Sequence, residues 1–249
     1  MTGIEYIKKS VSELFSNRLD GHDDRHIFRV WQTAMDFCNE IPEANRDLVA
    51  AAALLHDCDD YKLFGKESAR LMVNTRRILA ESGFDNAFTD KCINIVKTIG
   101  YSKRLSGIIP DCIEGKIVSD SDMADASGLI GIIRCMEYRA YRSKGGEPFF
   151  EPDCLPTKMD AEEYKQRTCW PVVNHFFDKL FLLRDLALTK PGRRCLTQRH
   201  KTLVKFLKTY FDEVNAPQIW KDLLVQYAGP KKVTTKTISK ALNSPRTHN

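Results

Sequence analysis

The side chains able to bind a metal ion are few in this chain, and they gather in a few short segments. Four histidines stand apart from the basic C-terminal stretches: His22, His26, His56 and His175. One of them is followed directly by an aspartate, where the apolar run "AAALLHD" ends at Asp57. The segment "SDSDMAD" adds three carboxylates: Asp120, Asp122 and Asp125. Imidazole and carboxylate groups are therefore available from separate parts of the chain.

This mixture of ligand types restricts the chemistry of the expected site. Imidazole and carboxylate ligands without thiolate suit Mn²⁺, Fe²⁺, Co²⁺, Ni²⁺ or Mg²⁺, with coordination positions left for water. Such an ion lowers the pKa of bound water and neutralises charge on a phosphoryl oxygen, which is the basis of metal-assisted hydrolysis. The eight cysteines are scattered and form no C-x-x-C pair, so we expect reduced thiols rather than a zinc or redox centre.

The elements that carry these ligands must bring them together. Adjacent side chains on a regular α-helix point about 100° apart, so His56 and Asp57 can share one ion only near a helix end. The preceding residues 44–57 are apolar nearly all round, which predicts a helix in the protein interior. His26 is expected to open another helix, and the three aspartates to lie at the start of a long helix over 116–140.

Helical periodicity dominates the rest of the chain, and convincing alternating β runs are absent from the sequence. Further helices are predicted over 4–18, 26–38, 66–82, 85–99, 160–190 and 193–214. Glycine and proline mark loops at 100–111 and 142–156. We therefore expect an all-α fold, with one helical-bundle domain over 1–228 and a disordered basic C-terminal tail over 229–249.

The net charge of +5 over 249 residues comes from that tail. It holds five basic residues and no acidic one, whereas basic and acidic residues are equal in number over the rest of the chain. We expect a solvated tail and no nucleic-acid partner. No apolar stretch approaches the roughly 18 residues of a membrane span, and the N-terminal residues lack the apolar core of a secretory signal. A cytoplasmic protein without membrane contact is expected.

The order His26, then His56-Asp57, then a distant Asp resembles the H…HD…D pattern of the HD-domain metal-dependent phosphohydrolases. Four blocks extend the resemblance, in order, over roughly residues 18–215: "GHDDRHIFRVW", "ALLHDCDDYK", "GKIVSDSDMADASGLIGIIR" and "NHFFDKLFLLRDLALTKPGRRCLTQRH". They are similar to blocks of a small bacterial branch that includes nucleotide pyrophosphohydrolases. The resemblance implies an all-helical fold. It also implies a single divalent ion, because the "GYP" element of the related cyclic-dinucleotide phosphodiesterases is absent from the sequence.

Four metal ligands follow from the resemblance: His26, His56, Asp57 and Asp122. Asp122 takes the position of the Asp in the family's "ADR"-like step, and Asp120 is the alternative ligand. Residues two apart on a helix diverge by about 200°, so only one of these two carboxylates should face the ion.

The chain departs from the family directly after Asp122. Relatives commonly have Arg-Leu at this point, where this chain has Met123-Ala124. If the family's Arg contacts substrate or braces the site, the choice of substrate here would differ and activity would be lower. The departure also supports an alternative function, a catalytically weak module that senses a nucleotide through its metal pocket.

Three residues near the ligand blocks are candidates for catalytic roles. In related (p)ppGpp hydrolases an acidic residue three positions after the HD aspartate orients or deprotonates the attacking water, and the resemblance gives this role to Asp60. Lys62 and Arg29 are candidates to neutralise phosphate charge, which phosphoryl transfer requires. For Arg29 an ion pair to a buried carboxylate is an equal alternative. Asp59 is interpreted as a surface charge.

Five further residues are candidates for substrate contacts: His22, Asp23, His175, Lys179 and Tyr101. His22 and Asp23 could equally cap a helix. His175 and Lys179 are four residues apart and should share a helical face, although a core histidine is the commoner role beside two phenylalanines. Tyr101 could stack on a base or simply be a buried tyrosine.

The sequence therefore predicts a metal-dependent phosphohydrolase. Its expected substrate is a small phosphorylated molecule, most simply a nucleotide, which loses phosphate or pyrophosphate by attack of metal-bound water. One divalent ion, Mn²⁺, Co²⁺, Ni²⁺, Fe²⁺ or Mg²⁺, is the expected cofactor. Nucleic-acid binding through the basic tail is the weakest of the functions considered.

Overall fold

The computed structural model describes residues 2–16, 24–142, 148–157, 163 and 171–229. All of its regular elements in these ranges are helical, which confirms the all-α prediction. The first half of the chain contains α1 (Gly3–Phe15), α2 (Asp24–Cys38), α3 (Arg46–Leu55), α4 (Tyr61–Leu71), α5 (Val73–Glu81), α6 (Asn86–Val96), α7 (Tyr101–Leu105) and α8 (Ile113–Asp125). The second half contains α9 (Gly128–Arg142), α11 (Val172–Asp178), the 3₁₀ helix η1 (Leu180–Leu186), α12 (Lys190–Glu213) and α13 (Gln218–Ala228).

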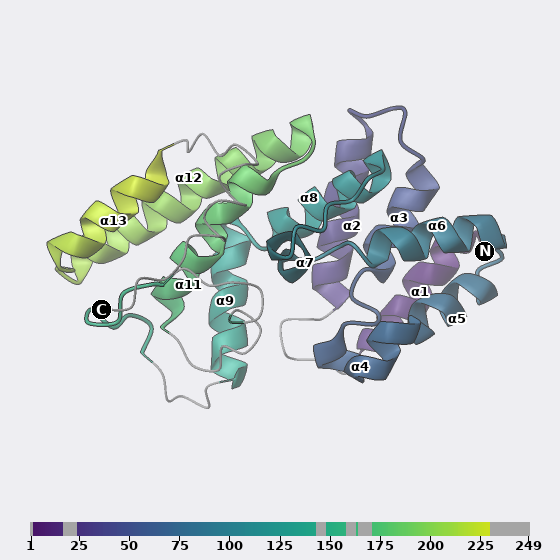
Figure 1. Cartoon of the computed structure of the whole chain (residues 1–249), viewed down its shortest axis with the longest axis horizontal. Coiled ribbons are helices and arrows are strands. Elements are labelled where there is room, and N and C mark those ends of the chain that lie inside the picture. The colour runs from purple at the N-terminus through teal and green to yellow at the C-terminus, as the bar shows by residue number, and fades with distance from the viewer. Residues whose placement is uncertain (1, 17–23, 143–147, 158–162, 164–170, 230–249) are drawn as a thin grey trace.

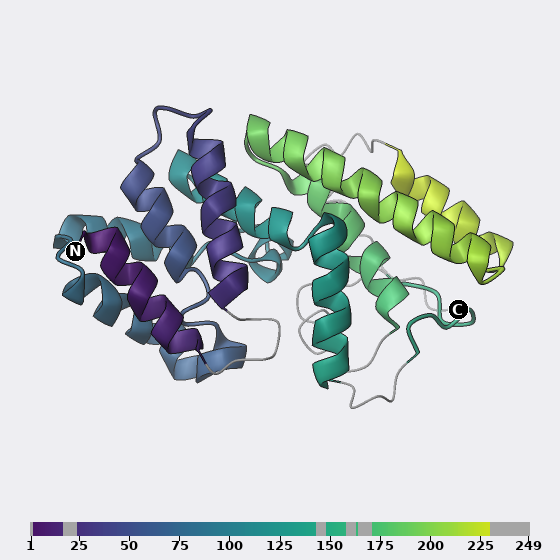
Figure 2. The same ribbon diagram turned by 180° about the vertical axis from the view of Figure 1, so that it is seen from behind.

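The described helices form two groups that meet around α8 (Figures 1 and 2). Helices α1 to α6 pack on one side, and α9 to α13 pack on the other. Each group surrounds its own cluster of buried apolar side chains. Helix α8 belongs to both, because Ile117 and Val118 lie in the first cluster while Met123 and Ala124 lie in the second.

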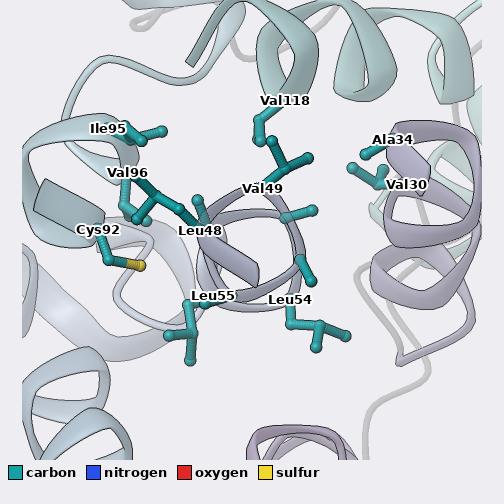
Figure 3. Close-up of a cluster of buried hydrophobic side chains, with 14 of the residues drawn as sticks. Val30, Ala34, Leu48, Val49, Leu54, Leu55, Cys92, Ile95, Val96 and Val118 are labelled. Carbon is teal, nitrogen blue, oxygen red and sulfur yellow. The ribbon is translucent and has the colours of Figure 1, made fainter. Parts of the chain in front are cut away.

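Helix α3 is the centre of the first group. Its residues from Leu48 to Leu55 are all buried, as expected for a helix that is apolar nearly all round. Figure 3 shows α3 end-on, with Val30 and Ala34 on one side, Ile95 and Val96 on another, and Val118 above. The buried helix ends at Leu55, and His56 is its C-cap residue. The predicted helix end at the His56-Asp57 pair is therefore confirmed.

Two of the predicted long helices are broken where a residue has a left-handed backbone. The helix predicted over 66–82 is interrupted at Met72, whose backbone is left-handed (φ 57°) and separates α4 from α5. The helix predicted over 116–140 ends at Asp125, and α9 begins at Gly128. Gly128 has φ +69°, a conformation that side-chain-bearing residues rarely adopt. A Cβ atom on Gly131 would overlap the Ala126 carbonyl group, so both glycines permit the break.

This break changes the position of the three aspartates. Asp120, Asp122 and Asp125 lie in the last turns of α8 rather than at the start of a long helix, so that prediction was wrong. The loop predicted over 100–111 contains the short helix α7, and the predicted helix over 160–190 is divided at Lys179 into α11 and η1. Helix α13 was not predicted.

Some predictions fall outside the described residues. These include the state of the tail, of which only Gly229 is described, and the roles of His22 and Asp23. The assignment of 1–228 to a single domain stays a prediction. Among the described residues, none of the helices combines the length and apolar character that crossing a membrane requires.

Candidate metal centre

Three helix ends bring four predicted ligands to one point. His26 lies in the first turn of α2, His56 caps α3, Asp57 follows in the next turn, and Asp122 lies in the last turn of α8. The two Nε2 atoms of His26 and His56 are 3.3 Å apart. Asp57 Oδ2 lies 3.5 Å from His26 Nε2 and 3.6 Å from His56 Nε2. Asp122 Oδ1 lies 3.7 Å and 3.9 Å from the same two nitrogens.

The opposite ring nitrogens fix the orientation of both imidazoles. His26 Nδ1 lies 2.7 Å from Asp125 Oδ2, and His56 Nδ1 lies 2.8 Å from the Ala53 carbonyl oxygen. Neither oxygen can donate when Asp125 is ionised, so each Nδ1 carries a proton, and the nitrogen that each ring turns to the centre is Nε2. Hydrogen bonds of this kind orient the imidazoles that ligate metals in proteins.

The convergence of acceptors fits a bound cation. Two imidazole lone pairs and two carboxylates face one another at the centre, and ligand atoms of His26, His56 and Asp122 all lie within 4.8 Å of one another. Acceptors gathered in this way repel one another unless a cation or proton lies between them. Burial opposes protonation of His56, but the Asp57 and Asp122 carboxylates outweigh it and raise its pKa. The donor set suits a divalent ion that prefers nitrogen and oxygen ligands.

Behind the histidines, Asp125 is buried and holds several partners. Besides His26 it accepts hydrogen bonds from Arg29, at 2.7 Å from Nε and 3.0 Å from Nη2, and from Arg134 Nη1 at 3.1 Å. Burial alone would raise the pKa of Asp125, but these donors lower it well below its usual range. Asp125 therefore stays ionised and supports the His26 ring.

Comparison with known proteins agrees with this geometry. Residues 23–127 match the family model described as the HD domain. A solved HD-superfamily hydrolase from Bacillus thuringiensis is 28% identical, with a TM-score of 0.64 over 86% of this chain and 97% of the other. The chain belongs to the HD-domain phosphohydrolase superfamily. Metal-dependent hydrolysis of a phosphate compound is accordingly its general activity.

Other proteins are similar to this chain over most of their length. The uncharacterized protein YpgQ of Bacillus subtilis (strain 168) is 29% identical over 210 residues, which cover 82% of this chain and 90% of YpgQ. A crystal structure of YpgQ in complex with ADP has a TM-score of 0.63 at 26% identity, and covers 85% and 97% of the two chains. A Lactobacillus plantarum protein has a TM-score of 0.74 at 26% identity, with 86% and 98% covered.

Within the HD domain, Asp120 and Asp122 have different surroundings. Asp120 is fully buried, and its carboxylate accepts hydrogen bonds from the Leu188 and Thr189 amides and from the Thr189 hydroxyl, at 2.7 to 3.1 Å. Burial raises the pKa of Asp120. These contacts attach α8 to the start of α12. Asp122 stands beside the two histidines instead.

The interpretation of Asp59 as a surface charge was wrong. Asp59 is buried, and it accepts hydrogen bonds from the Ser68 hydroxyl at 2.6 Å and from the amides of Asn74 and Thr75 at 2.9 Å. Because the chain turns sharply after His56, this carboxylate points inward to the start of α5 rather than to solvent. It fixes the turn that carries Asp57.

Asp60 and Lys62 lie at the start of α4. Asp60 is the N-cap residue of that helix, and its carboxylate accepts a hydrogen bond from the Lys62 amide at 2.8 Å. Asp60 is not on the same helix as His56, because α3 has already ended at Leu55. The Asp60 amide still donates to the Asp57 carbonyl at 3.1 Å, so the two residues remain neighbours. Lys62 is exposed.

Arg29 lies in the ion pair that was its alternative role, bound to the buried Asp125. Met123 and Ala124 are also buried, in the second apolar cluster. The position after Asp122 therefore turns toward the core of the second helix group, where it supplies no charge to the HD site.

The remaining candidates lie around α7 and the end of α11. Helix α11 ends at Asp178, and Lys179 has a non-helical backbone (φ −139°, ψ −61°), so the expected shared helical face of His175 and Lys179 is not formed. Tyr101 is buried, and its hydroxyl donates to the Asp178 carbonyl oxygen at 3.0 Å. The Lys179 ammonium lies 5.3 Å from the centroid of the Tyr101 ring. His175 is half-buried between the buried Phe176 and Asn174.

Proposed function

We propose that this HD-domain protein hydrolyses a nucleotide and releases phosphate or pyrophosphate. The observation that carries the proposal is the structure of YpgQ in complex with ADP, since YpgQ matches this chain over most of both lengths. The convergent histidines and carboxylates support it, because an ion in this position is suited to phosphoryl chemistry.

Four residues would hold the divalent ion: His26, His56, Asp57 and Asp122. When bound, such an ion polarises a phosphoryl oxygen and lowers the pKa of water, and Mn²⁺, Co²⁺, Ni²⁺, Fe²⁺ and Mg²⁺ all suit this donor set. The chain's own part is to aim the Nε2 atoms of the two histidines at the centre through Asp125 and Ala53. Asp57 and Asp122 supply the negative charge that balances the ion.

The proposed proton acceptor is Asp60. It is half-buried and adjoins Asp57 through a backbone hydrogen bond of 3.1 Å, which keeps its carboxylate close to the ligand turn. A general base has to lie within hydrogen-bond reach of the water that it deprotonates, directly or through a second water. Arg29 and Lys62 remain the proposed sources of positive charge for phosphate oxygens.

A nucleotide panel tests the proposal directly. Protein stripped with a chelator would be reloaded with each divalent ion and incubated with nucleoside mono-, di- and triphosphates, with phosphate and pyrophosphate measured separately. We expect product from at least one nucleotide, and none with Asp57→Ala. Asp90→Ala is the matched control, because Asp90 is exposed on α6. Absence of turnover on every nucleotide by metal-loaded protein would refute the proposal.

A nucleotide sensor with weak catalysis is the second candidate. It is favoured by Met123, which stands where relatives commonly have Arg and whose side chain is 2% exposed. A sensor would gain thermal stability on adding a nucleotide without forming product. Steady product formation would exclude it.

A further inference from the structure

Arg134 approaches the metal centre from the second helix group. It lies on α9, outside the 23–127 match to the HD domain, yet its Nη1 is 3.1 Å from Asp125 Oδ2. The same carboxylate oxygen lies 2.7 Å from His26 Nδ1. One atom of Asp125 thus joins the Arg134 guanidinium to a ligand histidine.

The break between α8 and α9 makes this approach possible. On one continuous helix, the nine positions from Asp125 to Arg134 would span about 13 Å along the axis. Because the chain turns through Gly128, α9 instead starts at the end of α8 and runs off in a new direction, as Figure 2 shows, so Arg134 in its second turn stays within reach of Asp125. Arg134 is therefore placed at the centre by the turn and not by helical periodicity.

The Arg134 guanidinium is separated from the metal centre by a single side chain. Its Nη1 shares Asp125 Oδ2 with His26 Nδ1, and the opposite nitrogen of that ring, Nε2, lies 3.5 Å from Asp57 Oδ2 and 3.7 Å from Asp122 Oδ1. With a divalent cation present, the ion and the two arginines on Asp125 outweigh the three carboxylates of Asp57, Asp122 and Asp125. The site would then attract an anion.

We propose that Arg134 is a substrate-binding residue, whose guanidinium contacts a phosphoryl oxygen while Asp125 holds it in orientation. This inference rests on the proposed function and names a phosphate contact for it. A guanidinium has five N–H donors in a planar fork, so it can bind a carboxylate and a phosphoryl oxygen together.

Arg134 suits this role better than Arg29. Arg29 offers Asp125 two nitrogens at once, in the fork arrangement that holds a guanidinium to a carboxylate, and its side chain is 37% exposed. The Arg134 side chain is 17% exposed. A partly sheltered charge is less screened by water, so a hydrogen bond from Arg134 to an anion should be the stronger of the two.

The opposing explanation is that Arg134 only neutralises the buried Asp125. The two explanations differ in which measured quantity changes. A phosphate contact affects KM and the binding of phosphate compounds, whereas loss of a purely structural ion pair affects metal affinity and stability through Asp125 and His26.

The test compares Arg134→Gln and Arg134→Lys with Arg139→Gln, a control on the same helix whose arginine contacts the Pro148 carbonyl instead. On Mn²⁺-loaded protein we would measure KM and kcat for the best nucleotide, calorimetric binding of inorganic pyrophosphate, Mn²⁺ affinity and Tm. We expect Arg134→Gln to weaken pyrophosphate binding and raise KM by roughly 10- to 100-fold. Arg134→Lys should recover part of this loss, and Arg139→Gln should behave as wild type.

Unchanged KM and pyrophosphate affinity in Arg134→Gln would overturn the inference. So would a loss of Mn²⁺ affinity that accounts for the whole effect. If Arg134→Gln does not fold, Arg134→Lys takes its place as the test, because it keeps the positive charge and removes only the planar set of N–H donors. Unchanged pyrophosphate binding by Arg134→Lys would again overturn the inference. Pyrophosphate binding requires no turnover, so an inactive wild type would refute the proposed function alone.

Discussion

His26 Nδ1 lies 2.7 Å from Asp125 Oδ2, and this contact turns the other nitrogen of the ring toward Asp57 and Asp122. The carboxylate is three residues beyond Asp122 on α8, so the same helix face provides a proposed ligand and the support for another. That spacing was the available sequence signal for Asp125, which we had counted only as one of three carboxylates.

Replacing the Asp125 carboxylate by an amide of the same shape should weaken metal binding. We expect Asp125→Asn to lower Mn²⁺ affinity about 10- to 100-fold, because a neutral amide is a poorer acceptor for the His26 N–H. Calorimetric Mn²⁺ titration of stripped protein measures this. Asp90→Asn, on the exposed face of α6, should bind as wild type. Equal affinities for Asp125→Asn and wild type would show that His26 does not need this partner.

Asp59 and Asp60 should respond differently to the same substitution. Asp59→Asn presents an amide group to three donors, so we expect the free energy of unfolding to fall by about 1–3 kcal/mol. Asn is as good an N-cap as Asp, so Asp60→Asn should change stability by less than about 0.5 kcal/mol.

Activity then separates the two roles. The nucleotide hydrolysis rate of Asp60→Asn should fall at unchanged stability, whereas folded Asp59→Asn should keep more of its activity. Urea unfolding and initial rates on the same preparations measure both quantities. Similar rates for the two variants would mean that Asp60 has no special part in the reaction.

Removing the metal should destabilise the folded protein. A ligand that binds only the folded state adds about 2.7 kcal/mol of stability at 100 times its Kd, so Tm should rise with Mn²⁺ concentration and fall with chelator. His56→Ala should abolish this dependence. His200→Gln should keep it, because His200 lies on α12 with its Nε2 bonded to the Tyr227 carbonyl oxygen. A Tm that is indifferent to divalent ions would contradict the proposed site.

His200 should make stability depend on pH. It is buried, and burial lowers its pKa from 6.5 to about 4. Between these values the unfolded chain binds a proton that the folded protein does not, so the free energy of unfolding falls as the pH drops from 6.5 toward 4. In His200→Gln this fall should be smaller. Urea unfolding across the window, with chelator in both samples, checks the difference; parallel curves would assign the dependence to other groups.

The sequence identified the parts of the site that depend on local pattern. The all-round apolar character of 44–57 placed α3 in the interior, and the adjacency of His56 and Asp57 required a helix end, which the structure has at Leu55. The histidines and aspartates were found by type and order. None of these steps needed knowledge of contacts between distant segments.

Other features depended on backbone conformation that periodicity does not report. The turn at Gly128 interrupts an apolar pattern that is typical of one helix. The pattern alone therefore could not predict where Arg134 lies. Asp59 was interpreted as a surface charge, but its partners Ser68 and Thr75 lie 9 and 16 positions further along the chain. Such contacts are set by how α4 and α5 fold back.

Helix α8 has a consequence for how the protein unfolds. Its Ile117 packs in one apolar cluster and its Met123 in the other, and its Asp120 accepts a hydrogen bond from the Thr189 amide at the start of α12. Neither group of helices can open without disturbing a helix that the other requires, so we expect one cooperative transition and similar hydrogen-exchange protection on both sides of α8. The HD-domain match over residues 23–127 is then smaller than the unit of folding.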